Sequence, residues 1–537
     1  MTALLLPSID HHLKNTNVDK TDLSQIPAGE RRWIGNLAGA LSSLLLAELV
    51  QHAEKKLIVM VAKNTTQVSQ IEEELHFFGV KPHLFPDWET LPYDRLSPHQ
   101  DIVSERLAIL SNMPKTGIVL IAATTLSQRI APPSWLLGQH FDIKKGQKFD
   151  VENERQRLTR AGYRAVDTVF EPGEFAVRGS LMDIFPTGQA APIRIDLFDD
   201  DIETLRHFDV ETQRTTEQVE QFTLLPAREF PLIEGRGEFR ARFAELFPQT
   251  TPKKMPLYED VLNGIAAPGL EYYQPLFFER DAFIEGGTLF DYLPSNALIA
   301  TDVAVEDCLS NFWQDLTQRY EDRRHNKDQP ILPPNELFLT VNELFGRLKS
   351  FGRLVLSQEP ISERAGAMNV TAHVPPKLPI DHRASNPLAA LKTFVDDFKG
   401  RILIVAESAG RRESLRDLFK PLFKDLPLCD DLPAFLASTH HIAMSVAPIE
   451  RGIWLDEASD RQNANQQFAL IVENQFFEQR VVQRRRRKAN DVSEEFLVKS
   501  LLELTIGAPV VHIDHGVGRY GGLVTLEIDE QTHEFLQ

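Results

Sequence analysis

Continuous runs of apolar residues mark two buried strands in the first quarter of the chain. The runs lie at residues 57–62 and 118–123. Uninterrupted apolar runs of this length are typical of strands that are buried on both faces of a sheet. Apolar positions recur at helical spacing over residues 33–50 and 67–78, which predicts two helices. Strands that alternate with helices predict a parallel sheet with crossover helices.

The hydrophobic pattern changes near residue 144 and becomes alternating. Between residues 175 and 208, turn-forming residues stand at Gly179, at 186–188 and at 199–201. A two-residue alternation that is interrupted by turns predicts antiparallel hairpins. We therefore expect an α+β domain that ends near residue 226.

The second half of the chain contains a mixed region and then another α/β pattern. Residues 228–360 combine helical segments, short strands and a proline-rich loop at 323–335. From about residue 390 the strand–helix alternation returns, which predicts a second α/β domain. Its expected elements are the end of a helix at 394–398, a strand at 401–406, a helix at 410–423, and strands at 441–447 and 468–473.

A basic run, Arg484–Lys488, separates this domain from the last segment of the chain. Concentrated charge of this kind is typical of a linker or of a solvated helix surface. A short helix at 496–504 and strands with glycine turns over 509–537 follow it. Because the sequence stops within an expected strand, we expect the chain to be a fragment of a longer protein.

Length and composition indicate a multidomain globular protein. At roughly 100 to 200 residues per domain, 537 residues correspond to about three to five domains. The net charge of −19 argues against a surface that binds nucleic acid broadly, although it does not exclude a local basic patch. Two cysteines, Cys308 and Cys429, exclude a disulfide framework and a cysteine-rich zinc site, and they fit a reducing cytosol. No secretory signal and no apolar run of about 18 residues is present, so we expect a cytoplasmic protein without a membrane partner.

The chain lacks the phosphate-binding loop that many nucleotide-binding α/β proteins share. That loop requires a Gly-Lys-Ser/Thr sequence, in which the lysine contacts the β- and γ-phosphates. No Gly-Lys pair occurs anywhere in the sequence. The stretch Gly35–Ser43 contains a glycine at Gly39, but Leu41 and Ser42 occupy the positions of the Gly-Lys pair. We expect this degenerate loop to bind no nucleotide.

No residue pattern indicates a catalytic site or a metal site. Residues 453–459 resemble a Walker B strand with its acidic pair, but an acidic turn explains them better in the absence of a phosphate-binding loop. Asp199–Asp201 are expected to form a hairpin turn, because aspartate favours turns. His512 and His515 stand three residues apart, which places them on opposite faces of a strand. We therefore expect no cofactor and no catalysis in this chain.

The best candidate for a binding surface lies in the hairpin region. Arg178 precedes the turn residue Gly179, and Arg194, Asp196 and Phe198 share one face of an expected strand. Arginine beside an aromatic residue is typical of protein-binding hot spots. The pattern alone favours a plainer interpretation, in which Phe198 belongs to the core and the arginines form a solvated face.

Five blocks of the sequence are distinctive in content and order. They begin at Asp87 (DWETLPYDRLSPHQDI), Gly173 (GEFAVRGSLMDIFP), Arg194 (RIDLFDDDIETLRHFD), Gly269 (GLEYYQPLFF) and Pro509 (PVVHIDHGVGRY). Together they resemble the front half of the bacterial transcription-repair coupling factors, from about residue 25 to the end of the chain.

The resemblance implies a front portion similar to the excision-repair protein UvrB. The family's ATP-driven DNA translocase, which uses ATP and magnesium and makes the main contacts with double-stranded DNA, would lie outside this chain. The implied domains are a UvrB-like domain 1a with the degenerate loop (25–140), a UvrA-binding domain 2 (141–227), domain 1b (228–360), an α/β domain 3 (361–472), a basic linker (473–495), and the start of a Tudor-like RNA polymerase interaction domain (496–537).

The resemblance also assigns roles to individual residues. It implies that Arg178, Arg194 and Phe198 bind the damage-recognition protein UvrA, which outweighs the plainer interpretation of these positions. It implies that Leu526 contacts the RNA polymerase β subunit, in a barrel that this chain does not complete. The segment from Tyr93 is short of the aromatic side chains with which UvrB probes DNA, and Arg484–Lys488 are the candidate for a contact with upstream DNA.

Two other functions compete with partner recruitment. An autonomous ATP-dependent helicase or nuclease component would need a phosphate-binding loop, which the chain lacks. A DNA-binding protein without sequence preference would need a basic surface, which the net charge opposes.

Overall fold

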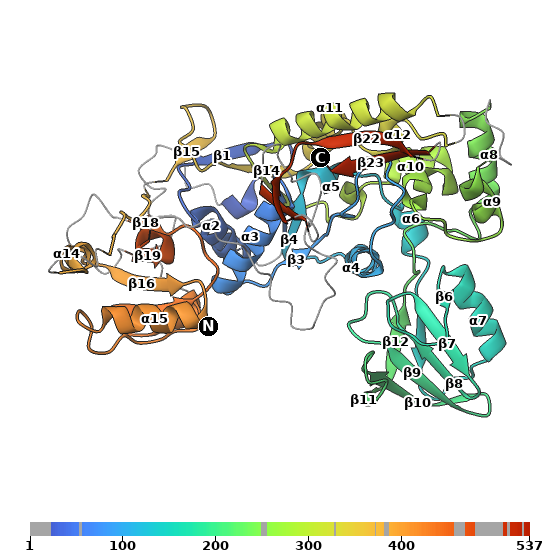
Figure 1. The fold of residues 1–537 in the computed structure, drawn as a ribbon, viewed down its shortest axis with the longest axis horizontal. Helices are drawn as coiled ribbons and strands as arrows, with labels where there is room; N and C mark the ends of the chain where they lie inside the picture. The colour runs from blue at the N-terminus through green and yellow to red at the C-terminus, as the bar shows by residue number, and fades with distance from the viewer. Residues whose placement is uncertain are drawn as a thin grey trace.

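The computed structural model describes residues 23–52, 56–248, 255–326, 329–370, 372–380, 386–455, 468–477, 509–512, 516–528 and 531–536. These residues form a mixed α/β structure with several domains, as expected from the sequence. An antiparallel domain projects from one end of the molecule, and a small α/β domain lies at the other end (Figure 1).

The first domain is built around a seven-stranded sheet in which the paired strands are parallel. The two expected apolar strands are confirmed as neighbours in this sheet. Two further strands come from residues 228–360, where the sequence pattern did not resolve them. In spatial order the strands are β15 (Ala367–Asn369), β1 (Arg31–Gly35), β14 (Gly352–Leu356), β13 (Leu298–Asp302), β2 (Leu57–Ala62), β4 (Gly117–Ala122) and β3 (His83–Leu84).

Helices pack on both faces of this sheet. Side chains such as Ile58 and Met60 point to one face, and Val59 and Val61 point to the other. The 3-10 helix η1 (Leu23–Gln25), α2 (Leu41–His52) and α3 (Thr65–Phe77) contribute to the first core, and α4 (Gln100–Ser111), α5 (Ala123–Ser127), α6 (Pro133–Leu136), α11 (Val305–Arg323) and α13 (Val341–Leu348) contribute to the second.

The helix expected over residues 33–50 is wrong in its first part. Residues 31–35 form β1, and α2 begins only at Leu41. The loop between them contains two left-handed residues, Asn36 with a φ of 58° and Gly39 with a φ of 67°. Residues with left-handed backbone can extend neither the strand β1 nor the helix α2. The spacing of apolar residues does not reveal where such residues occur.

A helix-rich layer beside the sheet contains a core of aromatic residues, including Phe239, Phe243 and Tyr272. Trp88 and Tyr93, which belong to the first distinctive sequence block, are buried in the same core. The elements of this layer are α8 (Arg236–Leu246), α9 (Pro256–Leu262), the 3-10 helix η3 (Leu270–Phe277), α10 (Arg280–Gly286) and α12 (Pro334–Leu337). The 3-10 helix η4 (Leu289–Asp291) contributes to the second core of the sheet.

The antiparallel domain is inserted in the chain between α6 and α8, and we call it the inserted domain. It contains a six-stranded sheet and has a core of its own. The expected hairpins are confirmed, and Asp199 turns the chain with a φ of 56°. One pair differs from the expectation, because β6 and β7 are parallel. The strands in order are β11 (Thr215–Val219), β10 (Asp201–Phe208), β9 (Ile193–Phe198), β8 (Leu181–Ile184), β7 (Glu174–Arg178) and β6 (Arg164–Ala165), with α7 (Val151–Arg160) and the pair β5 (Phe141–Lys144) and β12 (Gln221–Leu224) beside them.

The third domain is a four-stranded sheet that shares a hydrophobic core with the first domain. Leu403 and Leu470 of this sheet belong to the same buried cluster as Leu41 and Leu44 of α2. The elements are β17 (Ile442–Val446), β16 (Arg401–Ala406), β19 (Phe468–Val472) and β18 (Ile453–Leu455), in this order, with α14 (Ala389–Asp397), α15 (Ala409–Phe419), α16 (Leu432–Ala437) and the 3-10 helix η6 (Glu473–Gln475).

Four strands are described in the last segment of the chain. They form two separate antiparallel pairs, β20 (Pro509–His512) with β21 (Gly516–Arg519) and β22 (Leu523–Ile528) with β23 (Gln531–Leu536). Arg484–Lys488, the helix expected at 496–504 and His515 lie outside the described residues. In the part of the chain that the structure describes, no helix has both the length and the apolar character of a membrane span.

Candidate partner-binding face and degenerate nucleotide loop

The sheet of the inserted domain packs one face on its main core, and its other face carries a second, smaller buried cluster (Val169, Ala176, Phe185 and Phe208) beside exposed side chains. Along β9, Ile193, Ile195 and Leu197 are buried, whereas the side chains between them point outward. Successive residues of a strand alternate between the two faces, so Arg194, Asp196 and Phe198 share the outer face, as the sequence predicted. We call this surface, with Arg178 at the end of β7, the outer face of the inserted domain.

Phe198 is the most exposed large apolar side chain on this face, with 72% of its surface accessible. It stands at the end of β9, directly before the left-handed Asp199. The plainer interpretation from the pattern, in which Phe198 belongs to the core, is therefore wrong. An exposed aromatic ring beside charged residues is a feature of surfaces that bind other proteins.

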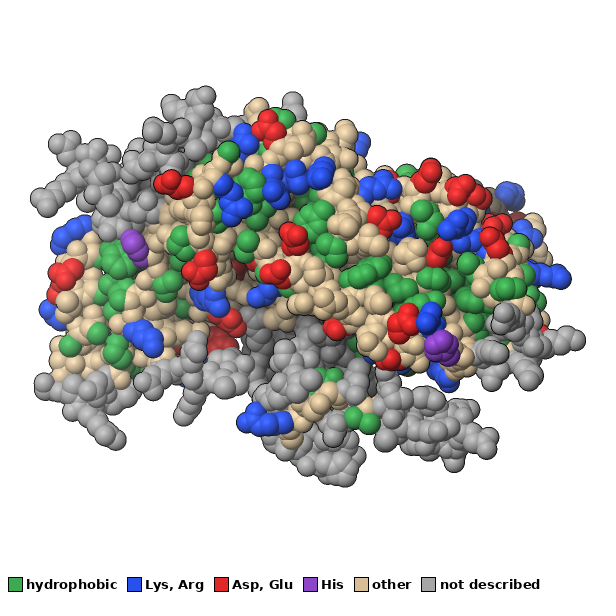
Figure 2. Space-filling model, turned by 90° about the horizontal axis from the view of Figure 1, so that it is seen from above, with side chains coloured by type: hydrophobic (Ala, Val, Ile, Leu, Met, Phe, Trp, Pro, Cys, Tyr) green, Lys and Arg blue, Asp and Glu red, His purple; other side chains and the backbone are tan. Residues whose placement is uncertain are grey.

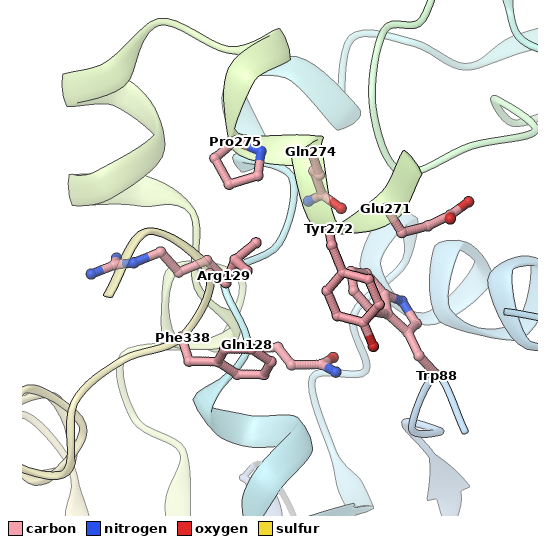
Figure 3. Close-up of a pocket in the computed structure, with 9 residues that line it drawn as sticks. Trp88, Gln128, Arg129, Glu271, Tyr272, Gln274, Pro275 and Phe338 are labelled. Carbon is pink, nitrogen blue, oxygen red and sulfur yellow. The ribbon is translucent and has the colours of Figure 1, made fainter. Parts of the chain in front are cut away.

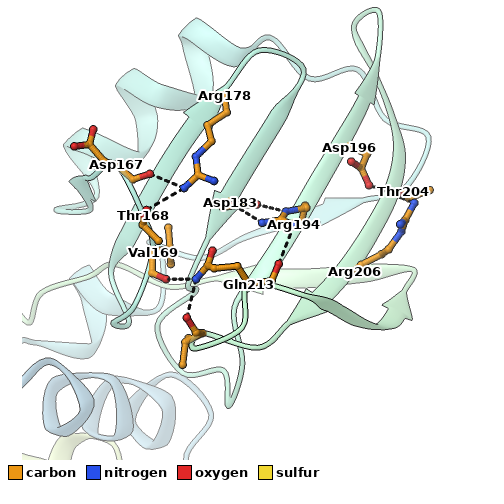
Figure 4. Close-up of polar contacts among 11 residues, drawn as sticks. Asp167, Thr168, Val169, Arg178, Asp183, Arg194, Asp196, Thr204, Arg206 and Gln213 are labelled. Carbon is orange, nitrogen blue, oxygen red and sulfur yellow. Dashed lines mark hydrogen bonds and ion pairs between the residues drawn. The ribbon is translucent and has the colours of Figure 1, made fainter.

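Arg178 is exposed, and the chain holds its guanidinium in place (Figure 4). Its Nη2 donates to the carbonyl oxygen of Asp167 at 2.6 Å and to the Oγ1 of Thr168 at 3.2 Å. Both acceptors are neutral, and no carboxylate among the described residues forms an ion pair with Arg178. Its charge therefore remains available to an acidic partner.

Arg194 occupies the same face but is fully engaged within the domain (Figure 4). Its Nε and Nη2 donate to the two carboxylate oxygens of Asp183 at 2.7 and 2.8 Å, and its Nη1 donates to the carbonyl of Gln213 at 3.3 Å. The guanidinium also lies 4.9 Å from the centre of the Phe208 ring. The hydrogen bonds to Asp183 raise the pKa of Arg194 above its ordinary value.

The sequence did not indicate Asp183 as part of this surface. Asp183 and Arg194 are directly opposite each other on β8 and β9, and only 4% of the Asp183 side chain is exposed. The two residues are eleven positions apart in the chain, so their pairing depends on the register of the hairpin. Arg194 therefore ties β8, β9 and the segment at Gln213 together, in addition to lying on the outer face.

The degenerate loop between β1 and α2 is closed by the third domain. A Cβ atom on Gly39 would lie 2.0 Å from the carbonyl oxygen of Gly452. Leu41 is completely buried, and Ser42 is half-buried. Residues of the third domain therefore lie directly against this loop at Gly39.

The hydroxyl of the degenerate loop is also used inside the protein. Ser43 is buried, and its Oγ donates to a carboxylate oxygen of Glu74 on α3 at 2.5 Å. Gln70 donates to the other oxygen of this carboxylate at 2.9 Å. Burial raises the pKa of Glu74 to about 7, and the nearby Glu450 also raises it, whereas the two hydrogen bonds and Arg451 lower it.

A small pocket lies between the segment at Trp88 and the 3-10 helix η3, as Figure 3 shows. Its free volume is about 10 Å³, which is about the space that one water molecule requires. The amide of Gln274 and the Oε1 of Gln128 are buried there without a hydrogen-bond partner among the described residues. The pocket has no counterpart of a phosphate-binding loop, so it does not supply the missing nucleotide site.

The remaining sequence candidates lie partly or wholly outside the described residues. Strand β18 runs antiparallel to β19, and the acidic pair after it, Asp456 and Glu457, lies outside the described residues. Leu526 lies on β22 opposite His533, and the structure describes the backbone of Leu526 only. Among the described residues, no group of three His, Cys, Asp or Glu side chains is arranged to hold a metal ion.

Comparisons with known proteins identify three segments of the chain. Residues 141–230 match the UvrB interaction domain, residues 394–476 match the MFD D3 domain, and residues 504–537 match the CarD-like/TRCF RID domain.

Longer matches join these segments into one similarity. Over 94% of its length, the chain is 38% identical to a transcription-repair-coupling factor of Haemophilus influenzae, and it covers 43% of that protein. The Escherichia coli protein of the same name is 37% identical over 95% of this chain, which covers 44% of that protein. The Myxococcus xanthus protein of the same name is 26% identical over 96% of this chain, which covers 44% of that protein. The chain therefore spans less than half the length of the curated relatives that it matches.

Replacing Glu74 with glutamine should remove a pH-dependent cost of folding. The folded protein keeps the Glu74 proton up to about pH 7, whereas the unfolded chain releases it near pH 4.5. The folded state binds more protons in this window, so the contribution of this group to stability is complete below pH 4.5 and is lost as the pH rises to 7. A pKa shift of this size corresponds to roughly 3 kcal/mol.

We therefore expect Glu74→Gln to raise the urea midpoint at pH 8 and to change it little at pH 5. Glu72→Gln on the same helix is the matched control and should show no such pH-dependent gain. An equal effect of Glu74→Gln at both pH values would contradict the assignment.

Replacing Gly39 with alanine should destabilise the contact between the first and third domains. The substitution adds a Cβ to a left-handed residue and directs it into the Gly452 carbonyl. Gly117→Ala is the matched control, because Gly117 has a φ of 88° but no atom within 4 Å of the added Cβ. Backbone strain alone costs about 1 to 2 kcal/mol. The urea midpoint should fall distinctly more for Gly39→Ala, and equal losses would show that Gly452 does not restrict this position.

Truncating Arg194 should destabilise the inserted domain, because Asp183 would remain buried without a counter-charge. We expect Arg194→Ala to cost roughly 3 kcal/mol in urea unfolding, and we expect Arg194→Ala with Asp183→Ala to regain part of this loss. Arg206→Ala is the control, since the Arg206 side chain is 41% exposed where it pairs with Asp196. That exposed pair should contribute less than about 1 kcal/mol. Similar costs for Arg194→Ala and Arg206→Ala would refute the structural role of Arg194.

Proposed function

Because this chain belongs to the transcription-repair-coupling factor family and corresponds to its N-terminal part, we propose that it recruits partners and does not hydrolyse ATP. In this proposal the inserted domain binds the damage-recognition protein UvrA. The full-length protein would use an ATP-driven DNA translocase outside this chain to remove a stalled polymerase. The front portion would then bring the nucleotide excision repair proteins to the lesion.

The outer face of the inserted domain is the observation that carries the proposal. It lies within the segment that matches the UvrB interaction domain, and it presents an exposed guanidinium on Arg178 and an exposed ring on Phe198. Charge-assisted hydrogen bonds from arginine and burial of an aromatic ring are the contacts that dominate most protein interfaces. Arg194 supports this face by holding its strands together, and its charge is already compensated by Asp183.

The degenerate loop supports the absence of ATP chemistry. The chain has no Gly-Lys pair, and the residues around Gly39 are packed against the third domain. The competing proposal of an autonomous helicase or nuclease component has no observation in its favour.

The last segment supports a second partner. Residues 504–537 match the CarD-like/TRCF RID domain, and we propose that this segment is the start of a Tudor-like barrel that binds the RNA polymerase β subunit. Leu526 on β22 is the proposed apolar contact. Two antiparallel strand pairs are described here, and polymerase binding would depend on strands beyond them.

Combined replacement of Arg178 and Phe198 with alanine should abolish binding of this chain to UvrA. Loss of a charge-assisted contact and of an exposed aromatic anchor should lower the affinity by roughly a hundredfold or more. Isothermal titration of UvrA with the chain measures the loss. Both side chains are exposed, so circular dichroism should show an unchanged fold.

Ile265→Ala is the matched control, because it removes a 54% exposed apolar side chain outside the inserted domain. It should bind UvrA like the parent chain. Normal affinity of the double variant would rule out the outer face as the UvrA site.

A further inference from the structure

Within the described part of the chain, no buried cluster covers one half of one face of the seven-stranded sheet. Parallel sheets are normally covered on both faces. The buried cluster that contains α11 and α13 includes residues of β2, β4 and β13 but none of β1, β14 or β15. On β1, β14 and β15, the side chains that point to this face are Trp33, Val355 and Ala367, and they are only half-buried.

Two arginines lie against the Trp33 ring on this face, and a third lies opposite one of them on the next strand. The guanidinium carbon of Arg31 lies 4.2 Å from the centre of the Trp33 ring, and that of Arg364 lies 5.0 Å from it. Arg31 and Arg353 are directly opposite each other in the register of β1 and β14, so their side chains emerge on the same side. We call Arg31, Arg353, Arg364 and Trp33 the arginine–tryptophan patch.

The charges of this patch have no acidic partner within the described residues. The neighbouring Glu30 pairs with Arg32 at 2.7 Å, and Glu363 makes no ion pair with the patch. Arg353 donates to the carbonyl of Gly29 at 3.0 Å, and its buried Nε has no acceptor among the described residues. Burial and the charge of Arg31 both lower the pKa of Arg353.

Like charges that face each other across two strands destabilise a sheet. The chain carries a net charge of −19, yet none of its described carboxylates pairs with these arginines. An anion from another molecule would offset the repulsion between them. Figure 2 shows Lys and Arg side chains gathered beside hydrophobic ones on the face of the molecule seen from above.

We propose that the arginine–tryptophan patch binds the phosphodiester backbone of a nucleic acid. Guanidinium groups fit phosphate oxygens in a two-pronged geometry, and arginine beside an aromatic ring is a common arrangement at nucleic-acid surfaces. A local patch of this kind is compatible with the acidic character of the whole chain. The contact is independent of the UvrA proposal, because the patch lies on another domain.

Fluorescence anisotropy with a labelled DNA duplex at low salt tests this proposal on the 537-residue chain. The variant Arg31→Gln, Arg353→Gln and Arg364→Gln should bind at least about tenfold more weakly than the parent chain. The slope of log affinity against log salt should fall by about 2 to 3, since each phosphate contact contributes roughly 0.9. Removing the facing charges relieves repulsion, so the urea midpoint of the variant should not fall.

The matched control is Arg155→Gln, Arg160→Gln and Arg240→Gln, which removes three exposed arginines outside the patch. It lowers the net charge equally and should leave binding and salt slope unchanged. Equal losses in both variants, or no binding by the parent chain at low salt, would overturn the proposal.

Competitors identify the chemistry that the patch recognises. Unlabelled duplex and single-stranded DNA should displace the probe, whereas inorganic phosphate should do so only weakly because it offers a single contact. Displacement by poly-glutamate of equal charge, at the same concentration as DNA, would indicate an acidic protein as partner and would contradict the proposal.

Discussion

One hydrophobic core joins the first and third domains, and the rest of the arrangement depends on it. Strands β16 and β19 of the third domain and helices α2 and α3 of the first contribute to the same buried cluster. At the edge of this core, Gly39 meets the Gly452 carbonyl so closely that no side chain fits between them. The loop that would cradle a phosphate in a nucleotide-binding relative is therefore part of a domain contact. The absence of the phosphate-binding lysine from this loop agrees with the contact that the loop makes with the third domain.

The inserted domain is organised in the opposite way. It has a separate core, and the other face of its sheet is only partly covered, by the small cluster around Phe208, so that Arg178 and Phe198 stay exposed. The Asp183–Arg194 pair gives this face a defined shape, because an ion pair with one nearly buried partner links adjacent strands. A rigid face with an exposed ring needs little reordering when a partner binds, which lowers the entropic cost of association. A closed loop in the first domain and an exposed surface on the inserted domain suit a protein portion that recruits.

Much of this organisation could be predicted from the sequence, for identifiable physical reasons. The apolar runs at β2 and β4 and the alternation along β9 depend only on local burial, and they were predicted correctly. The beginning of α2 was missed because left-handed Asn36 and Gly39 do not change the apolar spacing. Contacts set by register or by domain packing, such as Asp183 with Arg194 and Gly39 with Gly452, carry no local signal. Sequence pattern alone favoured burial of Phe198, whereas the ring is exposed. The binding role that the family resemblance implies for Phe198 stays a prediction.

Hydrogen exchange of the chain, measured by mass spectrometry with and without UvrA, tests the central claim most directly. Partner recruitment by the outer face predicts new protection of backbone amides in β7, β8 and β9, and unchanged exchange in the segment from β1 to α2. ATP added in place of UvrA should leave exchange unchanged everywhere. Protection confined to the first or third domain, or protection of the segment from β1 to α2 by ATP, would contradict the account.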